Sequence, residues 1–191
     1  MPEILPDHPA ELLERLNRLM KGPFDYEFSK YVYVPQSTKD DREYLRVPSL
    51  EAAGKVDSLL GSLKAHQELA LHSRLFRGSE VLHIPMLDLD QAFSDTHLAA
   101  LNDLMREFGV SEFAVYNSGR SAHVYGLGLL SAERLNQFFA RALLLNLPGK
   151  KPIVDARWIG HRLYAGYGSL RWSCNTKQYL GAPKAIGIFR S

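Results

Sequence analysis

The chain has 191 residues, 46% of them hydrophobic, and a formal net charge of +2 at pH 7, which suits one well-cored domain. No run of about eighteen apolar residues is present, and the N-terminus lacks the basic and then apolar pattern of a secretion signal. We therefore expect a soluble, cytoplasmic protein without a membrane partner. The single cysteine, Cys174, excludes an intramolecular disulfide and cysteine-rich zinc sites, so we expect no zinc and an oxygen-bound metal.

The first 78 residues predict a small α/β module without a recognisable motif. Apolar spacing predicts a helix over residues 9–20 and a strand over residues 28–34. Residues 35–48 are polar and turn-prone and predict a loop, and residues 49–71 are predicted to be mainly helical, with a break near Gly61.

Residues 79–191 show a more regular alternation of predicted elements. These are a strand over 81–90, a helix from Ser94 to Gly109, strands over 111–117 and 122–128 joined by a Ser118-Gly119 turn, a helix over 131–145, and a short strand over 152–155. This β-α-β-β-α-β order is the split βαβ pattern of ferredoxin-like and RNA-recognition-like folds. We therefore predict a single α/β (α+β) domain, 1–191, with an N-terminal α/β module, 1–78, and an RNA-recognition-like catalytic half, 79–191.

Two carboxylates stand at the end of the first strand of this pattern. Asp88 and Asp90 leave the same face of a strand because side chains alternate. Such a pair is tolerable where a divalent cation, Mg²⁺ or Mn²⁺, sits between the oxygens. In a split βαβ sheet, His123 and Asp155 lie next to this strand. Without these neighbours, the favoured interpretation is structural: the acid pair caps the next helix, and His123 is a half-buried histidine with backbone hydrogen bonds.

Positive charge is concentrated in the last quarter of the chain. Residues 149–191 hold eight basic side chains and one acid, Asp155. This charge is typical of a surface that binds phosphates of a nucleotide or a nucleic-acid strand, and a solvated basic surface is the alternative. Arg171 and Lys177 alternate with Trp172 and Tyr179, which is typical either of a strand with one solvated face or of an aromatic and basic surface for single strands.

Three segments in this order resemble the motifs of the archaeo-eukaryotic primase superfamily, which includes primase-polymerases and the polymerase domains of bacterial end-joining ligases. The segments are Asp88-Leu89-Asp90, the Ser118-Gly119 turn leading to Ser121-Ala122-His123, and Asp155 followed by Leu170-Arg171 and Lys177. The resemblance covers about residues 81–184. It implies the catalytic core of such a primase.

The resemblance also implies roles for individual residues. Asp88, Asp90 and Asp155 would hold two Mg²⁺ or Mn²⁺ ions, while Ser121 and His123 would contact the phosphates of the incoming nucleotide. Arg171 and Lys177 would neutralise the triphosphate. Further candidates are Arg162, because the spacing from Asp155 to Arg171 is long, Arg120, which is either a solvated loop charge or a template contact, and Tyr125, a candidate sugar contact.

The implied function is that of a small DNA primase or template-dependent DNA or RNA polymerase. Such a nucleotidyltransferase joins nucleoside triphosphates to a 3′-hydroxyl on a DNA template, and a helicase or accessory subunit is a candidate partner. The alternative is a non-catalytic module that binds single strands or nucleotides and acts with a partner.

Overall fold

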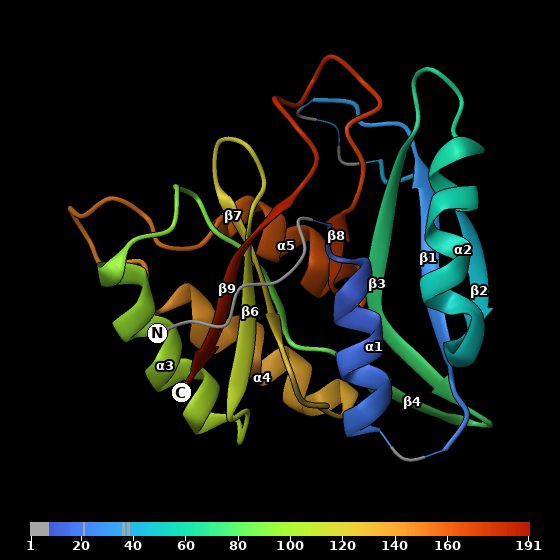
Figure 1. Ribbon diagram of the computed structural model, residues 1–191. Helices are drawn as coiled ribbons and strands as arrows, with labels where there is room; N and C mark the ends of the chain where they lie inside the picture. Colours follow the sequence, from blue (N-terminus) through green and yellow to red (C-terminus); the bar gives the residue numbers. More distant parts are fainter. Residues whose placement is uncertain (1–7, 21, 36, 38) are drawn as a thin grey trace.

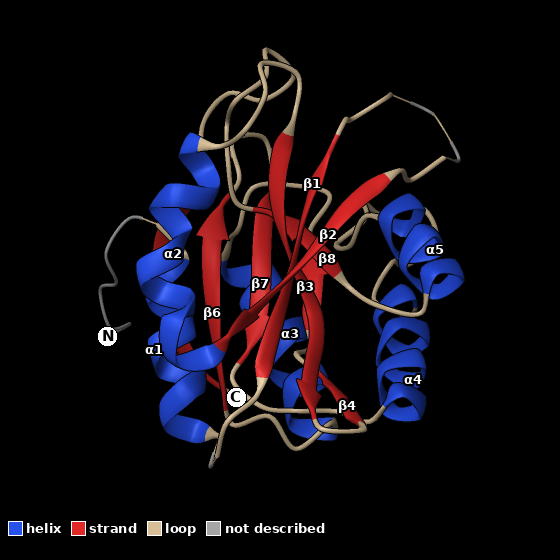
Figure 2. Cartoon of the chain, turned by 90° about the vertical axis from the view of Figure 1, so that its right-hand side faces the viewer, coloured by secondary structure: helices blue, strands red, loops and turns tan. Residues whose placement is uncertain are grey.

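The computed structural model describes residues 8–20, 22–35, 37 and 39–191. Segment 1–7, which we compared with a secretion signal, lies outside the described residues. Two β-sheets occupy the middle of the molecule, and helices cover them on two opposite sides (Figure 2). This arrangement confirms the mixed α/β class predicted from the sequence. Within the described ranges, no helix is long and apolar enough to cross a membrane.

The first sheet is built mainly from the N-terminal part of the chain. Its antiparallel order is β2-β1-β3-β4, and β8 joins the edge of β3 that β4 occupies further along. The elements of this layer are α1 (Ala10–Leu19), β1 (Asp25–Tyr31), β2 (Arg42–Pro48), α2 (Ser49–Gly61), β3 (Glu68–Arg77), β4 (Glu80–His83) and β8 (Ser169–Arg171). Residues from both sides of position 78 therefore build this sheet, and the division of the chain there stays a prediction.

The second sheet has the antiparallel order β5-β7-β6-β9 and lies beside the first sheet (Figure 1). Its elements and the helices behind it are β5 (Met86–Asp88), α3 (Asp95–Glu107), β6 (Glu112–Asn117), β7 (Ala122–Gly126), α4 (Ala132–Leu143), α5 (Ala156–Ala165) and β9 (Lys184–Arg190). An isolated bridge between Leu89 and Val154 extends the sheet beyond β5.

The two faces of the second sheet belong to different hydrophobic cores. Along β7, Val124 enters the core shared with α3, α4 and α5, and Tyr125 enters the core shared with α1, α2 and the first sheet. Met86 also belongs to the core on the side of the first sheet. Asp88 and His123 each lie two residues from a member of that core, so they occupy the face that turns toward the first sheet.

The structure corrects three predictions in the N-terminal part. The strand predicted over 28–34 is β1, which ends at Tyr31. β2 occupies the second half of the loop predicted over 35–48, and the helix predicted over 49–71 ends at Gly61 and is followed by β3. β3 lies inside the sheet, and its first six residues are all buried. Such a strand lacks the alternation of polar and apolar residues that distinguishes strands from helices in a sequence.

The structure also corrects the predicted first and fourth strands of the split βαβ pattern. The strand predicted over 81–90 is interrupted at Pro85, which has no N–H to donate, so β4 joins the first sheet and β5 the second. The predicted strand 152–155 is reduced to the bridge at Val154. This segment still lies beside β5, as the pattern requires, because the Asp90 N–H donates to the Ile153 carbonyl (3.0 Å). The sequence-based prediction does not contain α5, β8 or β9.

Candidate active site

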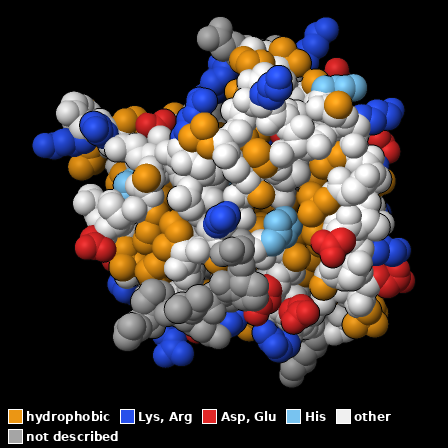
Figure 3. Space-filling view, turned by 45° about the horizontal axis from the view of Figure 1, so that its top comes forward, with side chains coloured by type: hydrophobic (Ala, Val, Ile, Leu, Met, Phe, Trp, Pro, Cys, Tyr) orange, Lys and Arg blue, Asp and Glu red, His pale blue; other side chains and the backbone are white. Residues whose placement is uncertain are grey.

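A cavity with a volume of about 540 Å³ lies between the two sheets, where loops from both halves of the chain meet. The loops gather at the upper end of the molecule in Figure 1. Among the described lining residues, six are basic and three are acidic: Lys39, Arg42, Arg120, Arg157, Arg162 and Arg171, and Asp40, Asp88 and Asp155. Figure 3 shows Lys and Arg side chains over much of the upper half of that view, and basic and acidic side chains mixed in the lower half. The cavity therefore suits an anionic ligand.

Asp88 and His123 lie opposite each other on paired strands. The register of β5 and β7 places them as direct neighbours, with 3.9 Å between His123 Nε2 and Asp88 Oδ1. The Ser121 hydroxyl donates to Asp88 Oδ1 over 3.4 Å. The turn before Ser121 is closed by a bond from the Ser118 N–H to the Ser121 carbonyl (3.0 Å), and Gly119 within it has a φ of +112°, which favours glycine.

Asp155 reaches the same place from the start of α5. Its carboxylate caps the helix by accepting the Trp158 N–H (2.9 Å), and its own N–H donates to the Asp88 carbonyl (3.0 Å). Burial raises the pKa of Asp88 to about 7, and the charges of Asp155 and, more weakly, Asp90 add to that rise. Asp155 and Asp90 thus each lie within electrostatic reach of Asp88. Asp90 is nonetheless exposed and does not line the cavity, because the strand has already ended there.

His123 is neutral near pH 7. Burial lowers the pKa of its imidazole to about 3, and the positive charge of Arg171 lowers it further. Its Nδ1 is buried and has no hydrogen-bond partner among the described residues. The other nitrogen, Nε2, is 3.9 Å from Asp88 Oδ1, beyond hydrogen-bond range, so this neutral ring in the cavity wall has a nitrogen that can bond to a bound ligand.

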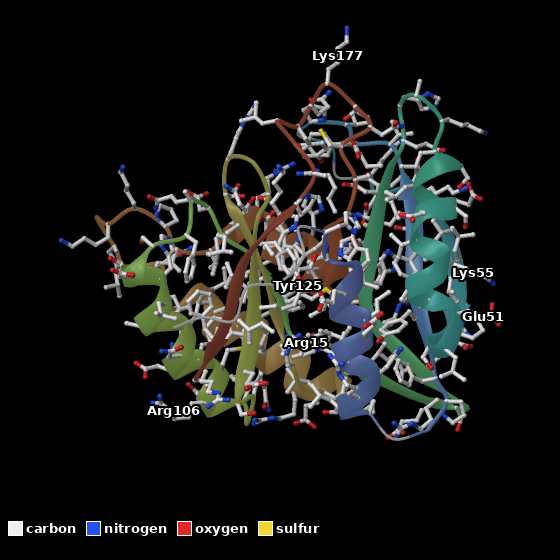
Figure 4. All side chains as sticks on the ribbon, in the orientation of Figure 1. Arg15, Glu51, Lys55, Arg106, Tyr125 and Lys177 are labelled. Atoms are coloured by element: carbon white, nitrogen blue, oxygen red, sulfur yellow. The ribbon has the colours of Figure 1, made fainter. Side chains whose placement is uncertain are left out.

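The predicted basic residues occupy different positions. Arg171 is buried in the cavity wall and donates to the carbonyls of Ser118 (2.7 Å), Gly181 (3.1 Å) and Ser173, so it ties together the loops around the site. Arg120 is exposed and Arg162 is buried, and both line the cavity. Lys177 is exposed, lies outside the lining, and points away from the molecule at the top of Figure 4. The structure therefore does not bring Lys177 to the other residues.

Two aromatic candidates lie in the core. Trp172 and Tyr125 are completely buried, and the Trp172 Nε1–H donates to the Tyr125 hydroxyl (2.9 Å). Figure 4 shows Tyr125 in the interior, and neither residue lines the cavity. Trp172 in this position cannot stack on a base, and Tyr125 does not reach a sugar. Tyr179 does line the cavity, and the Arg171 guanidinium lies 3.8 Å from the centre of its ring.

Comparison with known proteins identifies the family. The archaeo-eukaryotic primase 1D-like family matches residues 50–184. The chain belongs to this family. Its fold is similar to the crystal structure of the catalytic domain of primase RepB' in complex with initiator DNA, at 12% identity and a TM-score of 0.54, over 94% of this chain and 85% of that chain. It is also similar to the crystal structure of primase RepB', at 10% identity and a TM-score of 0.50, over 95% of this chain and 55% of that chain. A search of curated proteins returns no match.

Membership of the primase family confirms the resemblance inferred from the three motifs and the expected primase-like fold. Primases of this family generally use a divalent metal ion, so we compared the side chains of the cavity with the ligands that such an ion requires. Within the described part of the chain, no group of three or more His, Cys, Asp or Glu side chains could hold a metal ion. Mg²⁺ often binds through only one or two carboxylates and completes its shell with water and substrate phosphates. Asp88 and Asp155 fit that mode, and Asp90 as a third ligand stays a prediction.

Several residues that line the cavity were not predicted from the sequence. Tyr31 lines the cavity from the last residue of β1 and Arg42 from the first residue of β2. Tyr33 and Asp40 line it from the segment that joins these strands. The alternating burial of residues 42–48 is weak because most of β2 is exposed, so the segment resembles a loop. The signal that could have found these residues is the run of Tyr, Arg and Asp around a chain reversal.

The raised pKa of Asp88 leads to a prediction for stability. In the presence of a metal chelator, Asp88→Asn is expected to be about 1 kcal/mol more stable than the wild type at pH 8, and close to it at pH 4. The folded protein retains a proton on Asp88 up to pH 7, whereas the unfolded chain releases it near pH 4. Wild-type stability therefore falls as pH rises through this window, and asparagine removes the effect. Solvent limits its size, because 23% of the Asp88 side chain is exposed.

Urea unfolding at pH 4, 6 and 8 measures this difference. A stability gap between Asp88→Asn and the wild type that does not grow from pH 4 to pH 8 would contradict the prediction. Asp103→Asn is a matched control, because Asp103 is an exposed acid on α3 whose replacement is expected to change stability by less than about 0.5 kcal/mol.

Proposed function

We propose that the protein is a primase or template-dependent polymerase that adds nucleoside triphosphates to a 3′-hydroxyl on a DNA template. The observation that carries the proposal is the convergence of Asp88, Asp155 and His123 in one basic cavity of a chain that belongs to the archaeo-eukaryotic primase 1D-like family. Family membership alone supports a nucleotidyltransferase of the primase type. The cavity supplies the grouping of acids and cations that nucleotide addition needs.

In this proposal each group has a separate task. Two Mg²⁺ or Mn²⁺ ions would be held by Asp88 and Asp155, with Asp90 as a further candidate, and would lower the pKa of the 3′-hydroxyl and bind the triphosphate. The Nε2 of His123, beside Asp88, and the hydroxyl of Ser121 would hydrogen-bond to phosphate oxygens. Arg171 would hold the loops in place and add positive charge where charge builds up on those oxygens.

The cavity mouth supports a path for a single-stranded template. Tyr33 is 43% exposed, and its ring lies 5.8 Å from that of Tyr179. Exposed Val32, Val34 and Leu180 adjoin this pair in the cavity lining, and Arg120 supplies a cation nearby. Aromatic rings beside cations bind single strands by stacking on bases. The RepB' catalytic domain is similar in fold and was crystallised with initiator DNA.

The template path leads to a prediction for DNA binding. Tyr33→Ala is expected to weaken binding of a single-stranded DNA oligomer by about fivefold or more, because one stacked base is worth roughly 1–3 kcal/mol. Fluorescence anisotropy with a labelled oligomer measures the affinity. Tyr164→Ala is the matched control, because Tyr164 is 94% exposed and lies outside the cavity lining. Equal affinities of the two variants would count against this path.

Primer extension tests the proposed function directly. The protein is incubated with Mn²⁺, a primed DNA template and all four nucleotides, in separate reactions for deoxy- and ribonucleotides, and also with an unprimed template. Extended product and released pyrophosphate are expected from the wild type. Failure to exceed an Asp88→Ala, Asp90→Ala control in every reaction would contradict an autonomous enzyme and would favour the non-catalytic binding module or a subunit that needs a helicase or accessory partner.

A further inference from the structure

Arg162 is a buried charge with unused hydrogen-bond donors. Its side chain is 5% exposed, and it lines the cavity from α5. Its Nη2 donates to Asp40 Oδ2 at 2.7 Å, but its Nε and Nη1 are buried and have no hydrogen-bond partner among the described residues. Unpaired N–H groups on a buried guanidinium are costly. A ligand with several acceptor oxygens would satisfy them.

A second arginine, Arg42, binds the same carboxylate of Asp40. Arg42 Nε donates to the other oxygen of Asp40, Oδ1, at 2.8 Å. The Arg42 Nη1 also donates to the hydroxyls of Ser29 (2.9 Å) and Ser169 (3.0 Å), so its position is fixed by β1 and β8 as well as by Asp40. One carboxylate thus faces two oriented guanidinium groups in the cavity wall. This leaves an excess of positive charge at that point.

The geometry selects phosphate as the matching ligand. Arginine donors have the fork shape that binds phosphate through two oxygens at once. Asp40 offers only two oxygens, one to each arginine, whereas a phosphate group offers three or more and carries more negative charge. An arrangement that served only the fold would be expected to pair all the buried donors of Arg162 within the protein, as Arg42 pairs its own.

We infer that Arg162 and Arg42 form a phosphate subsite in the wall of the cavity next to the first sheet, and that Asp40 is the internal anion that holds the two arginines when no phosphate is bound. The subsite is separate from the Asp88 and Asp155 pair. The inference rests on the proposed function, since it names a phosphate contact of the same cavity. The phosphate belongs either to a nucleoside triphosphate or to a nucleic-acid strand.

Calorimetry with the full chain tests the subsite without turnover. Inorganic tripolyphosphate is titrated into the protein in the presence of a metal chelator, so that neither metal nor catalysis contributes. Arg162→Gln is expected to weaken binding by about tenfold or more. Arg141→Gln is the matched control, because Arg141 pairs with Glu107 at 2.9 Å outside the cavity lining, and it is expected to bind as the wild type does.

A second variant and a second probe complete the test. Arg162→Lys keeps the positive charge but loses the paired guanidinium donors, and it is expected to bind tripolyphosphate at least about threefold more weakly than the wild type. This variant provides the test if Arg162→Gln does not fold. A thymidine oligomer with a 5′-hydroxyl is titrated in parallel. Weakening for tripolyphosphate alone assigns the subsite to the nucleotide, and weakening for the oligomer alone assigns it to the strand. Wild-type affinity of a folded Arg162 variant for both probes would overturn the inference, whatever primer extension shows.

Discussion

Asp155→Asn is expected to slow nucleotide addition by about 10³-fold or more, equivalent to about 4 kcal/mol of activation free energy, while the protein stays folded. Asparagine accepts the Trp158 N–H as well as aspartate does, because the two are equivalent helix caps. It removes the negative charge that stands next to Asp88 and that would hold a divalent cation. The variant therefore separates the charge of Asp155 from its structural role. Single-nucleotide primer extension in Mn²⁺, with saturating nucleotide, measures the rate.

Asp155→Ala supplies the comparison that a single variant cannot. Alanine removes both the charge and the cap, so it is expected to lose the same activity and about 1 kcal/mol of stability in addition. Asp103→Asn, on an exposed acid of α3, is expected to retain activity within twofold of the wild type. If the wild type extends the primer and the rate of Asp155→Asn is within tenfold of the wild-type rate, Asp155 does not hold a catalytic metal.

The sequence predicts the centre of the candidate site because that centre depends on strand pairing. Alternation along a strand places Asp88 on a definite face, and the split βαβ order places His123 on the next strand. Asp155 follows because the segment before α5 returns beside β5, with its N–H bonded to the Asp88 carbonyl. These relations need only local periodicity and topology, which a single sequence carries.

The walls of the cavity depend on relations that one sequence does not carry. Arg42 reaches the site from an exposed strand whose alternation is faint, and β3 is buried on both faces and so resembles a helix segment. The tertiary structure decides where the basic residues of the last quarter point: Arg171, the last residue of β8, turns inward onto three carbonyls, whereas Lys177, between β8 and β9, points outward. The residue type therefore shows that a side chain is positively charged, but not which group that side chain contacts.

Trp172→Ala is expected to lower the free energy of unfolding by about 3–5 kcal/mol, a loss typical of a large buried aromatic side chain. Trp172 is completely buried and connects the two sheets, because its ring packs edge-on against Phe28 of β1 at 5.6 Å and its Nε1–H donates to Tyr125 of β7. Truncation leaves a cavity between the sheets and an unpaired Tyr125 hydroxyl. Urea unfolding followed by circular dichroism measures the loss.

Two further variants distinguish packing from a direct role in binding DNA. Trp172→Phe keeps most of the ring but not the hydrogen bond, so it is expected to lose less stability than Trp172→Ala and to bind single-stranded DNA as the wild type does. Tyr33→Ala, at the exposed cavity mouth, is expected to show the reverse: a stability change within about 0.5 kcal/mol and weaker DNA binding. A folded Trp172→Phe protein with a large loss of DNA affinity would mean that the indole contacts the strand, which its complete burial between the sheets opposes.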